Sequence, residues 1–253
     1  MEITILTIFP EMFTSPFSES IIKRAQEKEI VKINIIDIRN FTKDKHKSVD
    51  DYTYGGGPGM ILKPDPIIEA VEDIQGKKKR RPVLDSKVVV TSAQGKLFDQ
   101  KMAKKLSFQE KIIFICGRYE GIDERVSRML NAEEISIGDY VMTGGEIPAM
   151  VIVDVVIRML PGVLGKEESM INDSFYDGLL DYPHFTRPET YRGYKVPKIL
   201  LSGDHKKIEY WRKKQSILRT MVRRPDLLIN RNFSKKELEV IEDLKKDSEE
   251  RNE

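Results

Sequence analysis

The sequence is poor in the residues that build disulfides and metal sites. Its 253 residues include one cysteine, Cys116, and three histidines. A lone cysteine excludes an intrachain disulfide and any site made of several thiolates, and so few histidines argue against a histidine-based zinc cluster. Because Cys116 ends an apolar run, we expect it to act as a small buried hydrophobe rather than as a nucleophile.

Long apolar runs are also missing. No run approaches the roughly 18 apolar residues of a membrane-spanning helix. The first residues, MEITILTIFPEMF, carry neither a basic segment nor a small-residue cleavage site. We therefore expect a cytoplasmic protein that does not bind a membrane. Hydrophobic residues make up 40% of the chain, enough for an ordered core and, at this length, for two domains.

Net charge is small, at +2, but it is unevenly distributed. Residues 186–236 hold 15 Lys and Arg against 4 Asp and Glu, a balance of +11, whereas residues 237–253 hold 3 against 8. The basic stretch also contains Trp211 and three tyrosines. Cationic and aromatic side chains together are typical of a surface that binds nucleic acid. A solvated cationic helix face remains the alternative.

The first two thirds of the chain alternate between strand and helix patterns, which favours an α/β fold with a parallel sheet covered on both faces. We expect strands at 3–9, 32–38, 87–91, 111–116 and 133–137, and helices at 18–29, 64–74, 96–107, 123–130 and 147–160. The basic run 76–82 is expected to be a surface loop.

Beyond residue 165 the pattern changes, and residues 166–181 are polar and without periodicity, as in a linker or a mobile lid. From residue 203 onward we expect only helices. Asp204 is placed to cap a helix over 205–223, and Ser234 with Glu237 has the spacing of a capping box before a last helix. We thus expect domains at 1–165 and 182–253, the second one small and all-helical, joined by the linker 166–181.

The expected helix at 147–160 is apolar on nearly every face, which is typical of a helix enclosed on all sides. Its exceptions are Asp154 and Arg158, which are four residues apart. They could form an ion pair on the one open face. For Arg158 we favour the other interpretation, in which a guanidinium beside a cleft binds an anion.

Three glycine-containing turns follow expected strands: Thr91–Gly95, Gly117–Gly121, and the pair Ile137–Tyr140 and Thr143–Glu146. Ligands bind at the carboxyl ends of strands in open parallel sheets, so these turns could form one pocket for an adenosine-containing ligand. None of them matches a dinucleotide fingerprint or a Walker loop. A fourth loop, YGGGPGM at 54–60, could form an anion nest.

Several long motifs in order identify a family resemblance over essentially the full length. They are ITILTIFPEMF, YGGGPGM, GRYEG, SIGDYVMTGGEIPAM, PGVLG and DSFYDGLLDYPHFTRP, with LLSGDH, WR and RRPDLL elements after them. With these motifs the chain closely resembles the bacterial tRNA (guanine-N1)-methyltransferases of the SPOUT superfamily. The resemblance implies a trefoil-knotted domain that binds S-adenosylmethionine, a homodimer with shared active sites, and methylation of N1 of the guanosine just 3′ of a tRNA anticodon.

The resemblance also implies roles for individual residues. Asp173 would be the general base, Arg158 would stabilise charge on guanine O6, and Glu120 would lie by the cofactor's sulfonium and, with Asp173, hold Mg²⁺. Without the resemblance, the sequence around Asp173 favours a different role, that of a loop residue that caps a turn. The implied cofactor contacts are Ser92, Gln94, Gly95, Gly117, Tyr119, Glu120, Gly121, Ile137, Gly138, Tyr140, Met142, Gly144, Gly145 and Pro148. The implied tRNA contacts are Gly57, Asp177, His184, His205, Lys206 and Arg212.

Two positions depart from the family pattern. Ala93 replaces a common proline in the first loop, which should loosen that loop slightly. Asp204 replaces a residue that is usually neutral, and a carboxylate there favours the helix cap over a direct contact with RNA phosphates. Two other functions remain open: another SPOUT enzyme that methylates ribose 2′-OH groups or ribosomal RNA, and a non-catalytic RNA-binding module. The intact Asp173-Ser174-Phe175 motif and the expected C-terminal domain argue against the first.

Overall fold

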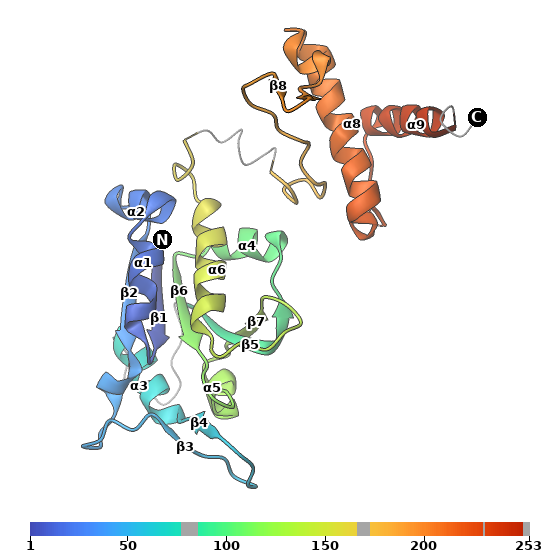
Figure 1. Ribbon diagram of the computed structural model, residues 1–253. Coiled ribbons are helices and arrows are strands. Elements are labelled where there is room, and N and C mark those ends of the chain that lie inside the picture. The colour runs from blue at the N-terminus through green and yellow to red at the C-terminus, as the bar shows by residue number, and fades with distance from the viewer. Residues whose placement is uncertain (77–85, 166–172, 230, 250–253) are drawn as a thin grey trace. The chain divides into compact units, whose positions relative to one another are not determined.

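The computed structural model describes residues 1–76, 86–165, 173–229 and 231–249. The chain forms two compact units, Met1–Gly165 and Lys166–Glu253 (Figure 1). Most of the basic run 76–82 and the segment 166–172 of the expected linker lie outside the described residues. Each unit is therefore described by itself.

The first unit is built on a five-stranded parallel sheet in the order β2-β1-β6-β5-β7 (Figure 1). This confirms the predicted α/β class with a parallel sheet. The strands occupy nearly the predicted positions: β1 (Glu2–Thr7), β2 (Lys32–Asp37), β5 (Lys87–Leu97), β6 (Lys111–Cys116) and β7 (Glu133–Ser136).

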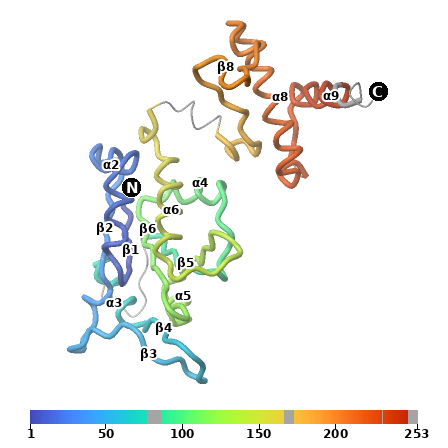
Figure 2. The backbone as a smooth tube through the Cα atoms, in the orientation of Figure 1, coloured from blue at the N-terminus to red at the C-terminus, as the bar shows by residue number. Residues whose placement is uncertain are grey.

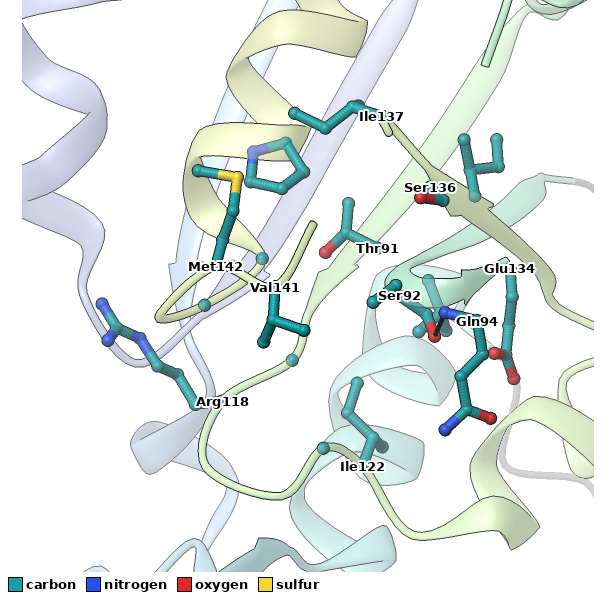
Figure 3. A pocket seen from close by; sticks show the side chains of 18 of the residues that line it. Thr91, Ser92, Gln94, Arg118, Ile122, Glu134, Ser136, Ile137, Val141 and Met142 are labelled. Carbon is teal, nitrogen blue, oxygen red and sulfur yellow. Dashed lines mark hydrogen bonds between the residues drawn. The ribbon is translucent and has the colours of Figure 1, made fainter. Parts of the chain in front are cut away.

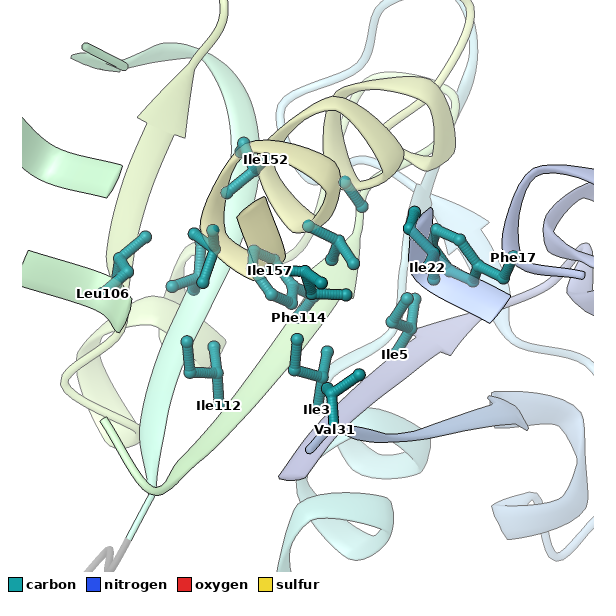
Figure 4. Packing of buried hydrophobic residues seen from close by; sticks show 14 of the residues in the cluster. Ile3, Ile5, Phe17, Ile22, Val31, Leu106, Ile112, Phe114, Ile152 and Ile157 are labelled. Carbon is teal, nitrogen blue, oxygen red and sulfur yellow. The ribbon is translucent and has the colours of Figure 1, made fainter. Parts of the chain in front are cut away.

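Both faces of the sheet are buried, because alternate side chains of each strand point to opposite sides. In β6, Ile112 and Phe114 belong to one hydrophobic cluster, and Ile113 and Ile115 belong to the other. Figure 4 shows the first cluster, in which helix residues such as Ile22, Leu106 and Ile152 meet the sheet. The helices of that face are α2 (Ser20–Glu27), α4 (Gln100–Ser107) and α6 (Glu146–Arg158), with η1 (Pro10–Phe13) and α1 (Thr14–Phe17) beside them; α3 (Pro64–Ile74) and α5 (Glu124–Met129) cover the other face.

Helix α6 is buried around most of its circumference and has one exposed face within this chain, as its composition predicted. Its side toward the sheet, which includes Ile152 and Val156, is buried, but Ile147 and Val151 remain 43% and 40% exposed. Asp154 is exposed on the same side. Ile147 and Val151 therefore form an apolar stripe on the one face of α6 that the sequence predicted to be open, the face of Asp154 and Arg158.

Strand β5 is longer than predicted, because it resumes after its glycine-containing turn. Thr91 and Lys96 both lie opposite Ile135 of β7, so the residues between them leave the ladder as a loop. The helix predicted from residue 96 begins instead at Gln100, where the Asp99 carboxylate accepts a hydrogen bond from the Met102 N–H at 2.8 Å.

A hairpin of β3 (Asp50–Tyr52) and β4 (Met60–Leu62) was not predicted. Its loop contains four glycines with positive φ, namely Gly55, Gly56, Gly57 and Gly59. Figure 2 shows this hairpin projecting from the body of the first unit. After β2, the 3₁₀ helix η2 (Ile38–Phe41) leads toward the hairpin.

The second unit contains the predicted helices α8 (His205–Arg223) and α9 (Lys235–Glu249). The Asp204 carboxylate accepts from the Lys207 N–H at 3.2 Å, and Glu237 accepts from the Ser234 N–H at 2.9 Å, so both predicted caps are confirmed. Leu179, Ile217 and Val240 form the small core. The unit also holds the 3₁₀ helices η3 (Lys198–Leu201) and η4 (Pro225–Leu228). The prediction of an all-helical domain over 182–253 is wrong at one place, where β8 (Thr190–Tyr191) and β9 (Tyr194–Lys195) pair as a short antiparallel hairpin.

Candidate functional site

The loop that interrupts β5 and the loops that follow β6 and β7 meet at one edge of the sheet and enclose a pocket of about 380 Å³ (Figure 3). The first turn of α6 closes its remaining side through Pro148. This is the carboxyl edge of parallel strands, where open α/β sheets bind their ligands. The three glycine-containing turns thus form one site, as their positions after the strands predicted.

Apart from Gly95, every residue that the resemblance assigns to the cofactor lines this pocket. Gly95 has a packing role. A Cβ there would lie 2.4 Å from the backbone carbon of Glu134, so only glycine lets β5 return to β7 after its loop. Sequence reasoning assigned no cofactor contact to Arg118 and Thr143, although both lie within the predicted turns. It also missed pocket residues outside the turns, among them Ile122, Glu124, Ser127, Glu134, Ser136 and Val141.

Backbone contacts join the pocket loops to one another. The Gly145 N–H donates to the Gly117 carbonyl at 2.8 Å, and Arg118 forms an antiparallel bridge with Gly144. A Cβ at position 145 would lie 2.0 Å from Thr91 Oγ1, so all three loops meet at this glycine. The loop geometry is therefore fixed by close backbone packing.

The lining of the pocket is chemically mixed. Ile122, Ile137 and Val141 are apolar and lie around it, as Figure 3 shows. Glu120 and Glu134 add carboxylates, and Glu134 accepts a hydrogen bond from Ser127 Oγ at 2.9 Å. Such a pocket can hold a planar apolar ring through side chains and backbone groups while placing a negative charge near a cation.

The glycine-rich loop of the β3–β4 hairpin reaches this site through Glu120. The Glu120 N–H donates to the Met60 carbonyl at 3.0 Å. A Cβ on Gly59 would lie 2.5 Å from Glu120 Oε1, so the loop packs directly on that side chain. Asp50, in strand β3 of this hairpin, also contacts the loop after β6: its carboxylate accepts a hydrogen bond from the Tyr119 hydroxyl. Burial first, and then the Asp50 carboxylate, raise the pKa of the Tyr119 hydroxyl.

Cys116 ends β6 beside the pocket and is only 1% exposed. Burial, followed by the nearby carboxylate of Glu146, raises the pKa of its thiol well above the ordinary value. A buried thiol that resists ionisation is a poor nucleophile. These observations agree with a packing role for Cys116.

The three residues expected to act in catalysis lie in different places. Glu120 lines the pocket. Arg158 is not beside the glycine loops: it ends α6, and the 13-residue helix carries it away from the pocket. At about 1.5 Å of rise per residue, it lies about 18 Å along the helix axis from Glu146. Asp173 belongs to the second unit, where its carbonyl accepts from the Tyr176 N–H at 3.3 Å in a tight turn.

The residues expected to bind tRNA are on exposed parts of both units. Gly57 lies in the loop of the β3–β4 hairpin with open space where a Cβ would be. His205 and Lys206 are exposed in the first turn of α8. Asp177, in contrast, accepts ion pairs from Lys213 and Arg231, each at 3.5 Å, so its charge is already balanced within the protein.

Aromatic rings accompany the basic residues of the second unit. The Arg212 guanidinium lies 4.9 Å from the centre of the Tyr182 ring, which in turn packs against His184 at 4.6 Å. His184 also hydrogen-bonds Asp181 at 2.7 Å. A hollow of about 450 Å³ beside Trp211 is lined by Ile199, Lys206, Lys207, Tyr210, Trp211 and Lys214. Cations around aromatic rings are suited to phosphates and exposed bases.

Across the residues that the structure describes, no group of three or more His, Cys, Asp and Glu is arranged to hold a metal ion. Glu120 and Asp173, the expected Mg²⁺ ligands, belong to different units. Among the same described residues, no helix combines the length and apolar character needed to cross a bilayer.

Comparisons with known proteins point to one family. The family described as tRNA (Guanine-1)-methyltransferase TrmD matches residues 1–230. A tRNA (guanine-N(1)-)-methyltransferase of Bacillus cereus (strain G9842) is 53% identical over 247 residues, which cover 98% of this chain and 100% of that protein. Proteins of the same name from Bacillus cereus (strain AH820) and Bacillus anthracis (strain A0248) are 54% identical over 245 residues, or 97% of this chain and 99% of each relative.

Proposed function

The chain belongs to the tRNA (guanine-1)-methyltransferase family, and we propose that it transfers the methyl group of S-adenosylmethionine to N1 of the guanosine just 3′ of a tRNA anticodon. The observation that carries the proposal is the pocket at the carboxyl edge of the sheet. It gathers nearly all the residues that the family resemblance assigns to the cofactor. With tRNA as its substrate, we propose that the enzyme acts in the cytoplasm.

The pocket fits S-adenosylmethionine by shape and by chemistry. Gly121, which lines the pocket, has a φ of +120° and nothing within 4 Å of the place of a Cβ, so the backbone there is open to a ligand. The apolar side chains of Ile122 and Ile137 suit the faces of an adenine ring. The carboxylate of Glu120 suits the positive sulfonium at the other end. When bound, the cofactor supplies an electrophilic methyl group.

Guanine N1 carries a proton at neutral pH, so its attack on a methyl group requires a base and a cation. Asp173 takes the N1 proton as the base. Arg158 stabilises the negative charge that accumulates on O6 as the proton leaves. None of these steps depends on Mg²⁺. The binding of Mg²⁺ by Glu120 and Asp173 stays a prediction.

A homodimer with shared active sites accounts for the position of Arg158. About 18 Å along the helix axis separates the backbone of Arg158 from the first residue of its own α6, so Arg158 is poorly placed to act on a base bound at the pocket end of that helix. The exposed stripe of Ile147 and Val151 on α6 supplies an apolar surface for a two-fold contact. In a dimer, the pocket of one subunit would receive Arg158 and Asp173 from the other.

We assign the SPOUT fold with its trefoil knot and cofactor binding to residues 1–165, and tRNA binding to residues 182–253. Asp173 belongs to the segment that the sequence predicts as a linker or lid, of which the structure describes residues 173–181. The net charge of +11 over residues 186–236 and the cation-lined hollow beside Trp211 support the tRNA assignment. The hollow is large enough for a base to stack on the indole ring.

The direct test is incubation with methyl-labelled S-adenosylmethionine and a tRNA transcript that has guanosine 3′ of its anticodon. We expect one labelled nucleoside, 1-methylguanosine, at that position by nuclease mapping and mass spectrometry. A transcript with adenosine there is the control and should stay unlabelled. Label on a ribose 2′-OH would indicate a different SPOUT activity, and tRNA binding without label would indicate a non-catalytic module.

A further inference from the structure

Glu146 is a buried carboxylate that the proposed chemistry does not use. It is the first residue of α6, and its side chain is 1% exposed. One carboxylate oxygen accepts from Thr7 Oγ1 at 2.9 Å, and the other accepts from Arg118 Nε at 3.2 Å. Moving a carboxylate out of water costs free energy. A carboxylate that is buried with two specific partners is therefore expected to serve the structure or the function of the protein.

Arg118 extends this pair to the surrounding loops. Its Nη1 donates to the Thr143 carbonyl at 3.0 Å, and its guanidinium lies 4.6 Å from the centre of the Phe9 ring. The hydroxyl of Thr7 also accepts from the Phe9 N–H at 3.0 Å. The end of β1, the loop after β6 and the loop before α6 therefore meet at one ion pair.

The loop before α6 closes directly on the pair. A Cβ on Gly144 would lie 2.4 Å from Arg118 Nε and 2.5 Å from Glu146 Oε2. Any side chain at position 144 would therefore displace the ion pair. The need for glycine at this position follows from the pair as well as from the ligand.

We propose that Glu146, Arg118 and Thr7 form a clamp that positions the Gly117–Gly121 and Thr143–Gly145 loops for the cofactor. The three are positioning residues, and the inference rests on the proposed function. The planar guanidinium of Arg118 suits the clamp because it donates to the Glu146 carboxylate and the Thr143 carbonyl from one rigid fork. A lysine ammonium has the same charge without that geometry.

The test compares Arg118→Lys and Glu146→Gln with the wild type by calorimetric titration of S-adenosylmethionine. We expect each variant to bind at least about tenfold more weakly, with the KM for S-adenosylmethionine raised more than kcat is lowered. The KM for tRNA should stay within about threefold. The double variant should lose much less than the product of the single losses, because both changes break the same pair.

Arg125→Lys is the matched control. Arg125 also forms an ion pair through Nε and Nη2, with Asp123 at 2.8 and 2.7 Å, but it does not line the pocket. Its replacement should leave the affinity unchanged. Hydrogen exchange adds a readout without cofactor: the amides of residues 143–145 should exchange faster in Arg118→Lys, while those of β6 keep their wild-type rates.

Failure of the clamp is distinguishable from failure of the proposed function. A wild-type protein that does not bind S-adenosylmethionine would overturn the proposed function. A wild type that binds it, with Arg118→Lys and Glu146→Gln binding equally well, would overturn the clamp alone. If both variants fail to fold, Thr7→Val decides. This substitution removes only the hydroxyl that donates to Glu146, and it should weaken binding of S-adenosylmethionine about threefold. An unchanged affinity would overturn the clamp.

Discussion

The backbone N–H of Gly145 donates to the carbonyl of Gly117 at 2.8 Å, and this bond ties the start of α6 to the loop after β6. The two glycines lie on segments that follow different strands of the sheet. Their contact sets the spacing of the pocket walls, so the pocket depends on backbone packing more than on any one side chain.

Gly145→Ala should therefore disrupt the pocket. The new Cβ would lie 2.0 Å from Thr91 Oγ1 and 2.8 Å from the Gly117 nitrogen, and the loops must separate to admit it. We expect affinity for S-adenosylmethionine to fall at least about tenfold, about 1.4 kcal/mol, in calorimetric titration. Gly165→Ala is the control, because a Cβ there has nothing within 4 Å. Equal affinities for the two variants would contradict this account of the pocket.

Asp173→Ala and Arg158→Ala should each slow methyl transfer by at least about 10²-fold, the usual effect of losing a general base or a charge-stabilising group. Single-turnover rates measured with saturating cofactor isolate this step. Affinity for S-adenosylmethionine should change much less, since Arg158 does not line the pocket and Asp173 is proposed to act on the bound guanine. Glu239→Ala, at an exposed position in α9, is the control. A near wild-type rate for Asp173→Ala would show that the base is another group.

Glu237 gives the second unit a pH-dependent stability. Burial opposes its ionisation, but hydrogen bonds from Ser234 and Arg231 outweigh burial and lower its pKa from 4.5 to about 2. Because the folded-state pKa is depressed, the stabilisation is present above about pH 4.5 and is lost as the pH falls toward 2. Glu237→Gln should lower the free energy of unfolding by about 1 kcal/mol at pH 7.

Trp211 provides the measurement, because it is the only tryptophan and lies in α8 of the same unit. Urea unfolding followed by its fluorescence should show the difference between wild type and Glu237→Gln shrinking between pH 4.5 and pH 2. Glu239→Gln, exposed on the same helix, should match the wild type throughout. A difference that stays constant with pH would assign the effect to packing instead of charge.

Much of this fold follows from local sequence signals. Helix α3 runs over Pro64–Ile74 as predicted, because Pro64 starts it and its apolar residues recur at helical spacing. The β3–β4 hairpin gave no such signal, since its strands have three residues each and flank a glycine-rich loop. Short strands pair through tertiary context, which a local pattern does not contain.

In the candidate site, too, some features follow from local sequence signals and others depend on tertiary contacts. The pocket loops were predictable because parallel strands bring their carboxyl ends to one edge. The Arg118–Glu146 pair joins residues 28 positions apart, and its members carry no motif that links them. Arg158 was expected beside a cleft, but it ends the 13-residue helix α6 whose first turn closes the pocket, so it lies at the other end of that helix. Sequence patterns thus located the loops, and the contacts between them required the structure.

The basic surface of the second unit should bind tRNA through its phosphates. Charge reversal at Lys206 and Arg212, both exposed in α8, should weaken tRNA binding and reduce its salt dependence, since fewer counterions are released. Lys213 is a poor choice, because it pairs with Asp177 and Glu237 inside the unit. Filter binding over a range of salt concentrations measures both quantities. If affinity and salt slope stay at wild-type values, the positive charge serves solubility alone.

The shared-site dimer makes a complementation prediction. Gly145→Arg should inactivate the cofactor pocket, and Asp173→Ala should remove the base. In a mixed dimer, the intact pocket of one subunit would meet the intact Asp173 of the other, so one site of two works. Equal mixing followed by reassociation should restore about a quarter of wild-type activity, because about half of the dimers are mixed. Mass spectrometry of differently tagged subunits counts the mixed dimers.

The position of Arg158 adds a second pairing to this experiment. Because about 18 Å of helix separates Arg158 from the pocket end of α6, its guanidinium should act in the partner's site. Gly145→Arg mixed with Arg158→Ala should then restore activity as well. Asp173→Ala mixed with Arg158→Ala is the informative control. If Asp173 and Arg158 of one subunit both act in the pocket of its partner, one site of the mixed dimer lacks the base and the other lacks the cation. These mixed dimers should then stay inactive. Should the Gly145→Arg mixtures stay inactive although mixed dimers form, pocket, cation and base all come from one chain.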